Sequence, residues 1–236
     1  MTNDLTRRAT AEFVGTAFLV AIVVGSGIYA QRLSPHNVGL QLLENSIATG
    51  AGLVALILAL GPVSGAHFNP IVTLADRILG GTPTRDAGVY VVVQIAGACV
   101  GAMVANLMFD LPAVEVSTHT RSSSGLWLGE IVASLGLILV ILGVVRAGRA
   151  SAAAFAVGGY IAAAYWFTSS TSFANPAVTI GRSLTDTFAG IAPSSVPAFI
   201  IFQIIGGLAG VAVGRYLNPN IPAADLIIPH DTPPRS

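Results

Sequence analysis

One short motif occurs twice in this chain of 236 residues, each time between long apolar segments. The copies read His67-Phe-Asn-Pro-Ile-Val-Thr-Leu and Phe173-Ala-Asn-Pro-Ala-Val-Thr-Ile, so both contain Asn-Pro-x-Val-Thr. Asn is a preferred N-cap residue, and Pro suits the first turn of a helix because its missing N–H costs nothing there. Each copy therefore predicts a short helix that begins after Asn69 or Asn175, with the side-chain amide at its N-terminal end.

The composition indicates an integral membrane protein. Hydrophobic residues make up 53% of the chain and charged residues only 9%, with a mean hydropathy of +0.76, whereas soluble domains carry about 25% charged residues. The formal net charge is zero, so no nucleic-acid partner is indicated. The sequence contains no nucleophile–base arrangement, phosphate-binding loop or Cys/His metal spacing. We therefore expect neither an enzyme nor a bound cofactor or metal.

Six segments are long and apolar enough to cross a bilayer, which requires about 20 residues. We expect these spans near residues 9–30, 40–62, 86–108, 126–146, 151–168 and 197–217. The two motif helices are too short to cross alone. Backbone of that kind is tolerated at membrane depth only where protein buries it or where it lines water.

The two halves of the chain repeat one another beyond the motifs. Gln94-Ile-Ala-Gly in the third span matches Gln203-Ile-Ile-Gly in the sixth, and Glu12 in the first span matches Glu130 in the fourth. With three spans in each half, the halves have opposite orientations in the membrane and form an inverted repeat. The repeats cover residues 9–108 and 126–217, within one channel domain at residues 1–217.

In an inverted repeat the two short helices enter from opposite sides and meet near the membrane midplane. Their positive dipole ends then repel cations there, while Asn69 and Asn175 offer amide donors to a passing oxygen. Ionisable groups inside spans are usually paired or functional. We expect Glu12 and Glu130 to accept hydrogen bonds from backbone N–H groups of the motif loops and to support those loops rather than relay protons.

The distribution of arginine predicts the orientation. One end of the predicted bundle carries Arg7, Arg8, Arg77, Arg85, Arg146, Arg149 and Arg215, and the other carries Arg32, Arg121 and Arg182. The positive-inside rule therefore places both termini in the cytoplasm. We expect residues 218–236, rich in Pro and Asp, to form a flexible cytoplasmic tail.

Three segments resemble signatures of the major intrinsic protein family, which comprises the aquaporins and aquaglyceroporins. They are Ala11-Glu-Phe-Val-Gly-Thr, Ser64-Gly-Ala-His-Phe-Asn-Pro and Phe173-Ala-Asn-Pro-Ala, with Ile71 where the family usually has Ala. The resemblance covers nearly the whole chain. It implies an all-α aquaporin-like fold of six transmembrane helices and two half-helices. It also implies a homotetramer in the lipid bilayer, with one pore per subunit that moves small neutral solutes down their gradients.

The resemblance also implies which residues line the pore. The pore motifs would be Asn69, Pro70, Ile71, Asn175, Pro176 and Ala177. Backbone carbonyls along the pore wall would come from Gly65, Ala66, His67, Thr171, Ser172 and Phe173.

The narrowest part of the pore departs from the family pattern. Val178 stands where most members have an arginine that follows the second motif. A count without gaps puts Thr49, Ala163 and Ser172 at the other filter positions, and a two-residue shift in the fifth span would bring Tyr165 there instead of Ala163. Such a filter would be wide, uncharged and weakly polar, and would admit larger hydroxylated solutes.

Arg182 lies one helical turn beyond Val178, and two roles are open for it. It could line the outer vestibule, or it could pair with Asp186 four residues later as a surface contact.

Val178 and the following Thr-Ile-Gly-Arg-Ser-Leu-Thr-Asp-Thr-Phe-Ala-Gly segment resemble a bacterial branch of aquaglyceroporins associated with arsenic resistance. That resemblance implies passage of arsenite as As(OH)3, besides glycerol-like polyols and water, across the bacterial inner membrane. The alternatives are a general water and glycerol facilitator and an ion-coupled secondary transporter, since broken helices in inverted repeats build transporters too.

Overall fold

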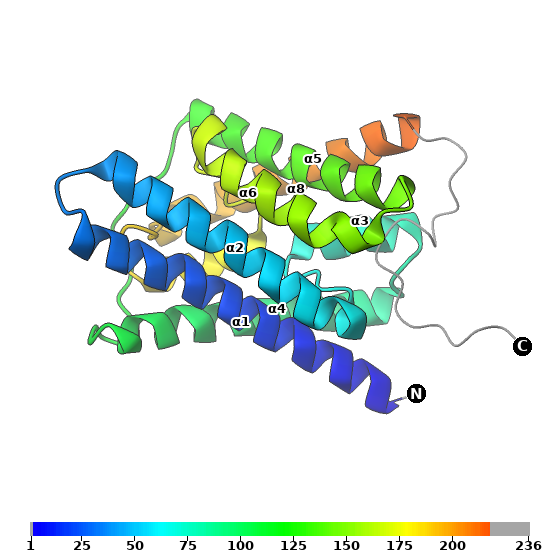
Figure 1. Cartoon of the computed structure of the whole chain (residues 1–236), viewed down its shortest axis with the longest axis horizontal. Coiled ribbons are helices and arrows are strands. Elements are labelled where there is room, and N and C mark those ends of the chain that lie inside the picture. Colours follow the sequence, from blue (N-terminus) through cyan, green and yellow to red (C-terminus); the bar gives the residue numbers. More distant parts are fainter. Residues whose placement is uncertain (1, 218–236) are drawn as a thin grey trace, which may run out of the picture.

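The computed structural model describes residues 2–217, which form a bundle of long helices around two short ones (Figure 1). Six helical segments are long and apolar enough to cross a membrane, which confirms the predicted number of spans. The long helices are α1 (Thr2–Leu33), α2 (Val38–Ser64), α4 (Thr84–Met108), α5 (Ser124–Arg146), α6 (Ala153–Phe167) and α8 (Val196–Leu217). The single-turn 3₁₀ helices η1 (Ala150–Ala152) and η3 (Pro193–Ser195) precede α6 and α8. The tail expected at residues 218–236 lies outside the described residues.

The two short helices begin at the prolines of the repeated motif. They are α3 (Pro70–Leu79) and α7 (Pro176–Gly181), the second of which continues into the 3₁₀ turn η2 (Arg182–Leu184). The Asn69 side chain accepts a hydrogen bond from the backbone N–H of Ile71, and the Asn175 side chain accepts from the second and third residues of its helix. Both asparagines are therefore N-caps, as the motif predicts.

Glycine allows two pairs of long helices to approach at backbone distance. A Cβ on Gly97 of α4 would lie 2.4 Å from the carbonyl oxygen of Phe13 on α1. In the second half, a Cβ on Gly206 of α8 would lie 2.4 Å from the carbonyl oxygen of Ile131 on α5. Any larger residue would push these helices apart. The same contact recurs in both halves, so the repeat seen in sequence is also a repeat in packing.

Two connections lie together at the end of the bundle where α1 ends and α2 begins, opposite the N-terminus (Figure 1). We call this the distal end. The connection at residues 109–123 runs beside η2, because Glu115 N–H donates to the Leu184 carbonyl (3.0 Å) and Ser117 N–H to the Ser183 carbonyl (3.0 Å). The segment at residues 185–192 follows η2 and leads to α8. Both connections therefore adjoin η2, which continues α7 at the distal end.

Candidate functional site: a central cavity between the half-helices

The loops that lead into α3 and α7 have matching backbone conformations. Ala66 and Phe68 have φ values of 49° and 47°, and Ser172 and Ala174, at the equivalent positions, have 52° and 47°. Gly65 and Thr171 form a third pair, at 85° and 62°. Left-handed conformations of residues other than glycine cost about 1–3 kcal/mol each and persist only where the surroundings enforce them. Each loop therefore needs strong support.

Glu12 supplies this support in the first half. This fully buried carboxylate accepts hydrogen bonds from the backbone N–H groups of His67 (2.9 Å) and Phe68 (2.7 Å), and from the Ser64 hydroxyl (2.6 Å). The Gln94 amide nitrogen donates to Glu12 (2.8 Å) and to the Thr73 hydroxyl of α3 (3.0 Å). Loop, half-helix and two long helices are thus tied to one carboxylate.

Glu130 makes the equivalent contacts in the second half. It is also fully buried, and it accepts from the backbone N–H groups of Phe173 (3.0 Å) and Ala174 (2.9 Å). The Gln203 amide nitrogen donates to Glu130 (2.5 Å) and to the Thr179 hydroxyl of α7 (2.9 Å). Charge-assisted hydrogen bonds of this kind are about twice as strong as neutral ones. The two glutamates are therefore the groups that hold the strained loops in place.

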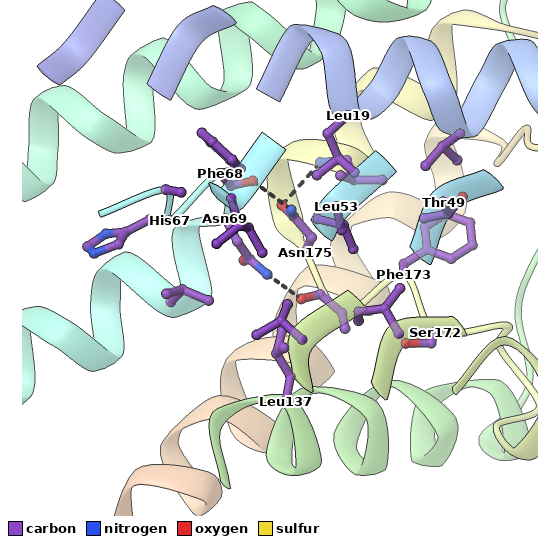
Figure 2. Close-up of a pocket in the computed structure, with 18 of the residues that line it drawn as sticks. Leu19, Thr49, Leu53, His67, Phe68, Asn69, Leu137, Ser172, Phe173 and Asn175 are labelled. Atoms are coloured by element: carbon purple, nitrogen blue, oxygen red, sulfur yellow. Dashed lines mark hydrogen bonds between the residues drawn. The ribbon is translucent and has the colours of Figure 1, made fainter. Parts of the chain in front are cut away.

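The two asparagines bind each other's loops across the centre of the bundle. Asn69 Nδ2 donates to the carbonyl oxygen of Ala174 (2.7 Å), and Asn175 Nδ2 donates to that of Phe68 (2.8 Å), as the dashed lines in Figure 2 show. An amide nitrogen carries two N–H groups, so one donor of each asparagine is used in this crossed pair. The second N–H of each is available to the cavity that both residues line.

A cavity of about 80 Å³ runs past the crossed asparagines. That volume exceeds the roughly 10–15 Å³ of accessible space that a cavity needs to hold one water molecule. The sequence-predicted residues that line it are Thr49, Gly65, Ala66, His67, Asn69, Tyr165, Ser172, Phe173, Asn175, Val178 and Arg182. The motif residues Pro70, Ile71, Pro176 and Ala177 are buried beside it, in the first turns of the half-helices.

Two predicted residues lie away from the cavity. Ala163 is exposed on the outside of α6, whereas Tyr165, the alternative for the fifth span, is buried and lines the cavity. Ile161 and Tyr165, four residues apart, share the cavity face of α6, and Ala163, two residues from each, lies on the opposite face of that helix. The prediction of Ala163 is therefore corrected to Tyr165. The second residue is Thr171, which has the left-handed backbone conformation described above but does not reach the cavity.

The distal part of the cavity carries three hydroxyl-bearing side chains beside the apolar Val178. The Thr49 hydroxyl lies 3.2 Å from the Tyr165 hydroxyl. The Ser172 hydroxyl is buried and has no hydrogen-bond partner within residues 2–217, and Val178 is apolar and 5% exposed. Figure 2 shows Thr49, Ser172 and Phe173 to one side of the asparagines and His67 to the other. The His67 Nδ1 lies 3.1 Å from the Thr73 hydroxyl.

Arg182 lines the cavity, and Asp186 has other partners. Arg182 is 3% exposed, its Nε donates to the carbonyl of Ala189, and its guanidinium carbon lies 3.5 Å from the centre of the Phe173 ring. Asp186 accepts from the backbone N–H of Thr118 (2.8 Å). Of the two roles open for Arg182, the structure thus favours the one at the cavity.

Sequence reasoning missed the apolar wall of the cavity. The additional lining residues are Leu19, Val23, Leu53, Ile57, Phe68, Val72, Leu137, Ile141, Ala153, Val157, Ile161 and Ala174. Several are spaced four apart on one helix, a pattern that marks a common face but does not distinguish a cavity wall from a packed core. An apolar wall with a few polar groups suits small uncharged solutes. Within residues 2–217, no cluster of three or more His, Cys, Asp and Glu side chains is placed to hold a metal ion.

Comparison with known proteins agrees with this architecture. The sequence model of the family described as Major intrinsic protein matches residues 1–164. The chain is 50% identical over 214 residues to Aquaglyceroporin AqpS of Rhizobium meliloti (strain 1021), covering 91% of each chain. It is 31% identical to Probable aquaporin AqpM of Archaeoglobus fulgidus, covering 92% of this chain and 99% of the relative. The X-ray structure of the aquaglyceroporin from Plasmodium falciparum shares the fold, with a TM-score of 0.71 at 20% identity over 91% of this chain and 98% of that one.

Proposed function

The chain belongs to the major intrinsic protein family of membrane channels, and we propose that it is a passive channel for small neutral solutes that carry hydroxyl groups. Members of this family are channels rather than enzymes, so solute passage is the activity to be explained. The solutes we propose are glycerol-like polyols, water and arsenite as As(OH)3. Export of As(OH)3 would serve arsenic resistance.

The observation that carries this proposal is the makeup of the distal part of the cavity. Its four filter residues are Thr49, Tyr165, Ser172 and Val178, which supply three hydroxyls and one apolar side chain. Valine at position 178 adds neither a fixed charge nor donors at the point where family members usually have arginine. A constriction without an arginine side chain is wider and admits solutes larger than water. Glycerol and As(OH)3 each carry three hydroxyls, which can form hydrogen bonds with the hydroxyls of the cavity wall.

The arrangement of the membrane assembly is also part of the proposal. The arginine distribution supports a chain with both termini in the cytoplasm of a bacterial cell and with the distal end outside. Large apolar side chains are exposed on the outer surface of the bundle, among them Phe18, Leu58, Val92, Trp166 and Ile201. Such a surface suits contact with lipid and with neighbouring subunits, and we propose a homotetramer with one pore in each subunit.

The test is reswelling of proteoliposomes that contain the purified protein, with glycerol, As(OH)3 and water compared in the absence of any ion gradient. We expect rapid entry of both hydroxylated solutes, without saturation. Val157→Trp places a large side chain in the cavity wall and should abolish entry. The matched control Val213→Trp changes an exposed residue of α8 and should not.

Other results would contradict parts of the proposal. Fast water movement with glycerol and As(OH)3 excluded would mean a water channel. Entry of glycerol without As(OH)3 would mean a general facilitator with no role in arsenic export. Uptake that requires a proton or sodium gradient would mean a coupled transporter.

A further inference from the structure

Arg182 is a buried cation in the wall of the cavity. It lies one helical turn beyond Val178, and only 3% of its surface is exposed. A charged residue is seldom buried to this extent unless it is paired. Within residues 2–217, no carboxylate lies within 4.0 Å of its guanidinium group.

The protein holds Arg182 by one nitrogen and by the face of its guanidinium group. Nε donates to the Ala189 carbonyl, and the guanidinium lies over the Phe173 ring. The two terminal nitrogens donate to no protein group in the described part of the chain, and neither is sealed away from the cavity. A guanidinium presents its donors in a fixed fork, so these nitrogens are free to bind oxygen in the cavity.

The segment that anchors Arg182 is itself held by a second arginine. Arg121 Nε donates to the Gly190 carbonyl (2.9 Å), and its Nη2 lies 3.4 Å from the Phe188 carbonyl. Its guanidinium carbon lies 5.2 Å from the centre of the same Phe173 ring. Arg121 therefore holds residues 188 and 190 by their carbonyls, and the carbonyl of residue 189 between them accepts the hydrogen bond from Arg182. The side chain of Arg182 is thus fixed by the surrounding fold.

We propose that Arg182 supplies the positive charge of this pore's outer filter, one turn farther from the asparagines than the residue at position 178. Its terminal nitrogens donate to the oxygens of neutral solutes, and its charge repels cations at the distal mouth. A charge in a low-dielectric wall acts far more strongly on a passing ion than one in water. The filter is thus charged but remains wide at the level of Val178. This inference rests on the proposed function, because the charge can select only in a cavity that conducts.

The experiment compares potassium leak with glycerol permeability in proteoliposomes that carry a potassium gradient. Arg182→Gln removes the charge but keeps a donor that can reach the Ala189 carbonyl. We expect its potassium leak per unit of glycerol flux to rise at least about tenfold. Arg32→Gln is the matched control, since Arg32 also donates to a backbone carbonyl, that of Phe109 (2.6 Å), and lies over a phenylalanine ring, but is exposed and away from the cavity. Its ratio should equal that of the unaltered protein.

Two further variants separate a charge effect from a folding effect. Arg182→Lys keeps the charge and should keep the low leak. The potassium leak of Arg182→His should be low at about pH 5 and high at about pH 8, because imidazole loses its charge between these values. Both measurements use the same folded protein, so a difference in folding between variants does not affect the comparison. An unchanged ratio in Arg182→Gln, or a leak in Arg182→His that does not depend on pH, would overturn the inference. Absence of glycerol flux in the unaltered protein would instead count against the proposed function.

Discussion

Ile71 of α3 occupies the space that a side chain at position 207 of α8 would need. A Cβ built on Gly207 would lie 2.4 Å from Cγ2 of Ile71, and the isoleucine side chain is 2% exposed. The equivalent positions in the repeat, counted from the paired glutamines and motifs, hold Ala177 and Ala98, both fully buried. The pair formed by α3 and α8 thus combines a large residue with glycine, whereas the equivalent positions of α7 and α4 hold two small residues. The unusual Ile71 in the first motif is accommodated by a change in a distant helix.

Gly207→Ala should therefore destabilise the protein. The new methyl group has no space beside Ile71, and overpacking of this kind costs about 1–3 kcal/mol. Thermal unfolding in detergent should show a lower midpoint for Gly207→Ala. Gly159→Ala is the matched control, because a Cβ on Gly159 in α6 meets no atom within 4 Å.

A second variant tests whether Ile71 is the cause of that loss. Ile71→Ala combined with Gly207→Ala reproduces the two small residues at the equivalent positions of α7 and α4, so it should recover most of the midpoint. If the double variant is as unstable as Gly207→Ala alone, the clash lies elsewhere.

Glu130→Gln should reduce both stability and solute flux. The carboxylate accepts backbone N–H groups from Phe173 and Ala174, and the amide that replaces one oxygen can only donate. At least one buried N–H then loses its acceptor, at a cost of about 1–3 kcal/mol. The strained loop relaxes, and glycerol permeability should fall with the thermal midpoint. Glu115→Gln, on the exposed connection at the distal end, should change neither, and equal effects of the two variants would show that Glu130 does not support the loop.

The sequence predicted those parts of the molecule that depend on local rules or on the repeat. Asn69 and Asn175 cap their helices because capping depends on a few adjacent residues, and the pairing of Gln94 with Gln203 revealed two equivalent halves. Ala163 was wrong because a count of residues from the motif does not establish which face of α6 lines the cavity. The packing of Ile71 against Gly207 depends on two helices distant in sequence. Even a correct list of spans does not reveal which side chains face each other across the bundle.

The distal connections should loosen in acid. Hydrogen bonds from the backbone N–H and the hydroxyl of Thr118 lower the pKa of Asp186 below its ordinary value. A carboxyl whose pKa is lower in the folded state stabilises the fold above its unfolded pKa, about 3.9. That contribution is lost as the pH falls through the lower, folded value. Proteolysis at residues 109–123 should therefore accelerate between about pH 5 and pH 3.

Asp186→Asn should show faster proteolysis already at neutral pH and a weaker dependence on acid. Asp110→Asn, at an exposed position in the same connection, should retain the pH dependence of the unaltered protein. Identical pH profiles for Asp186→Asn and the unaltered protein would remove Asp186 from this role.

Val178→Arg should convert a wide pore into a narrow one. Val178 lines the cavity and is 5% exposed, so a guanidinium at that position enters the cavity, which Thr49 and Ser172 also line. Stopped-flow light scattering should show water permeability retained, while glycerol and As(OH)3 permeabilities fall by about tenfold or more, because the larger solutes no longer fit. Val178→Leu adds bulk without donors or charge and should reduce glycerol flux less than the arginine does. If arginine at position 178 leaves the glycerol and As(OH)3 fluxes unchanged, residue 178 lies outside the constriction. The narrowest point is then formed by Tyr165 and Thr49.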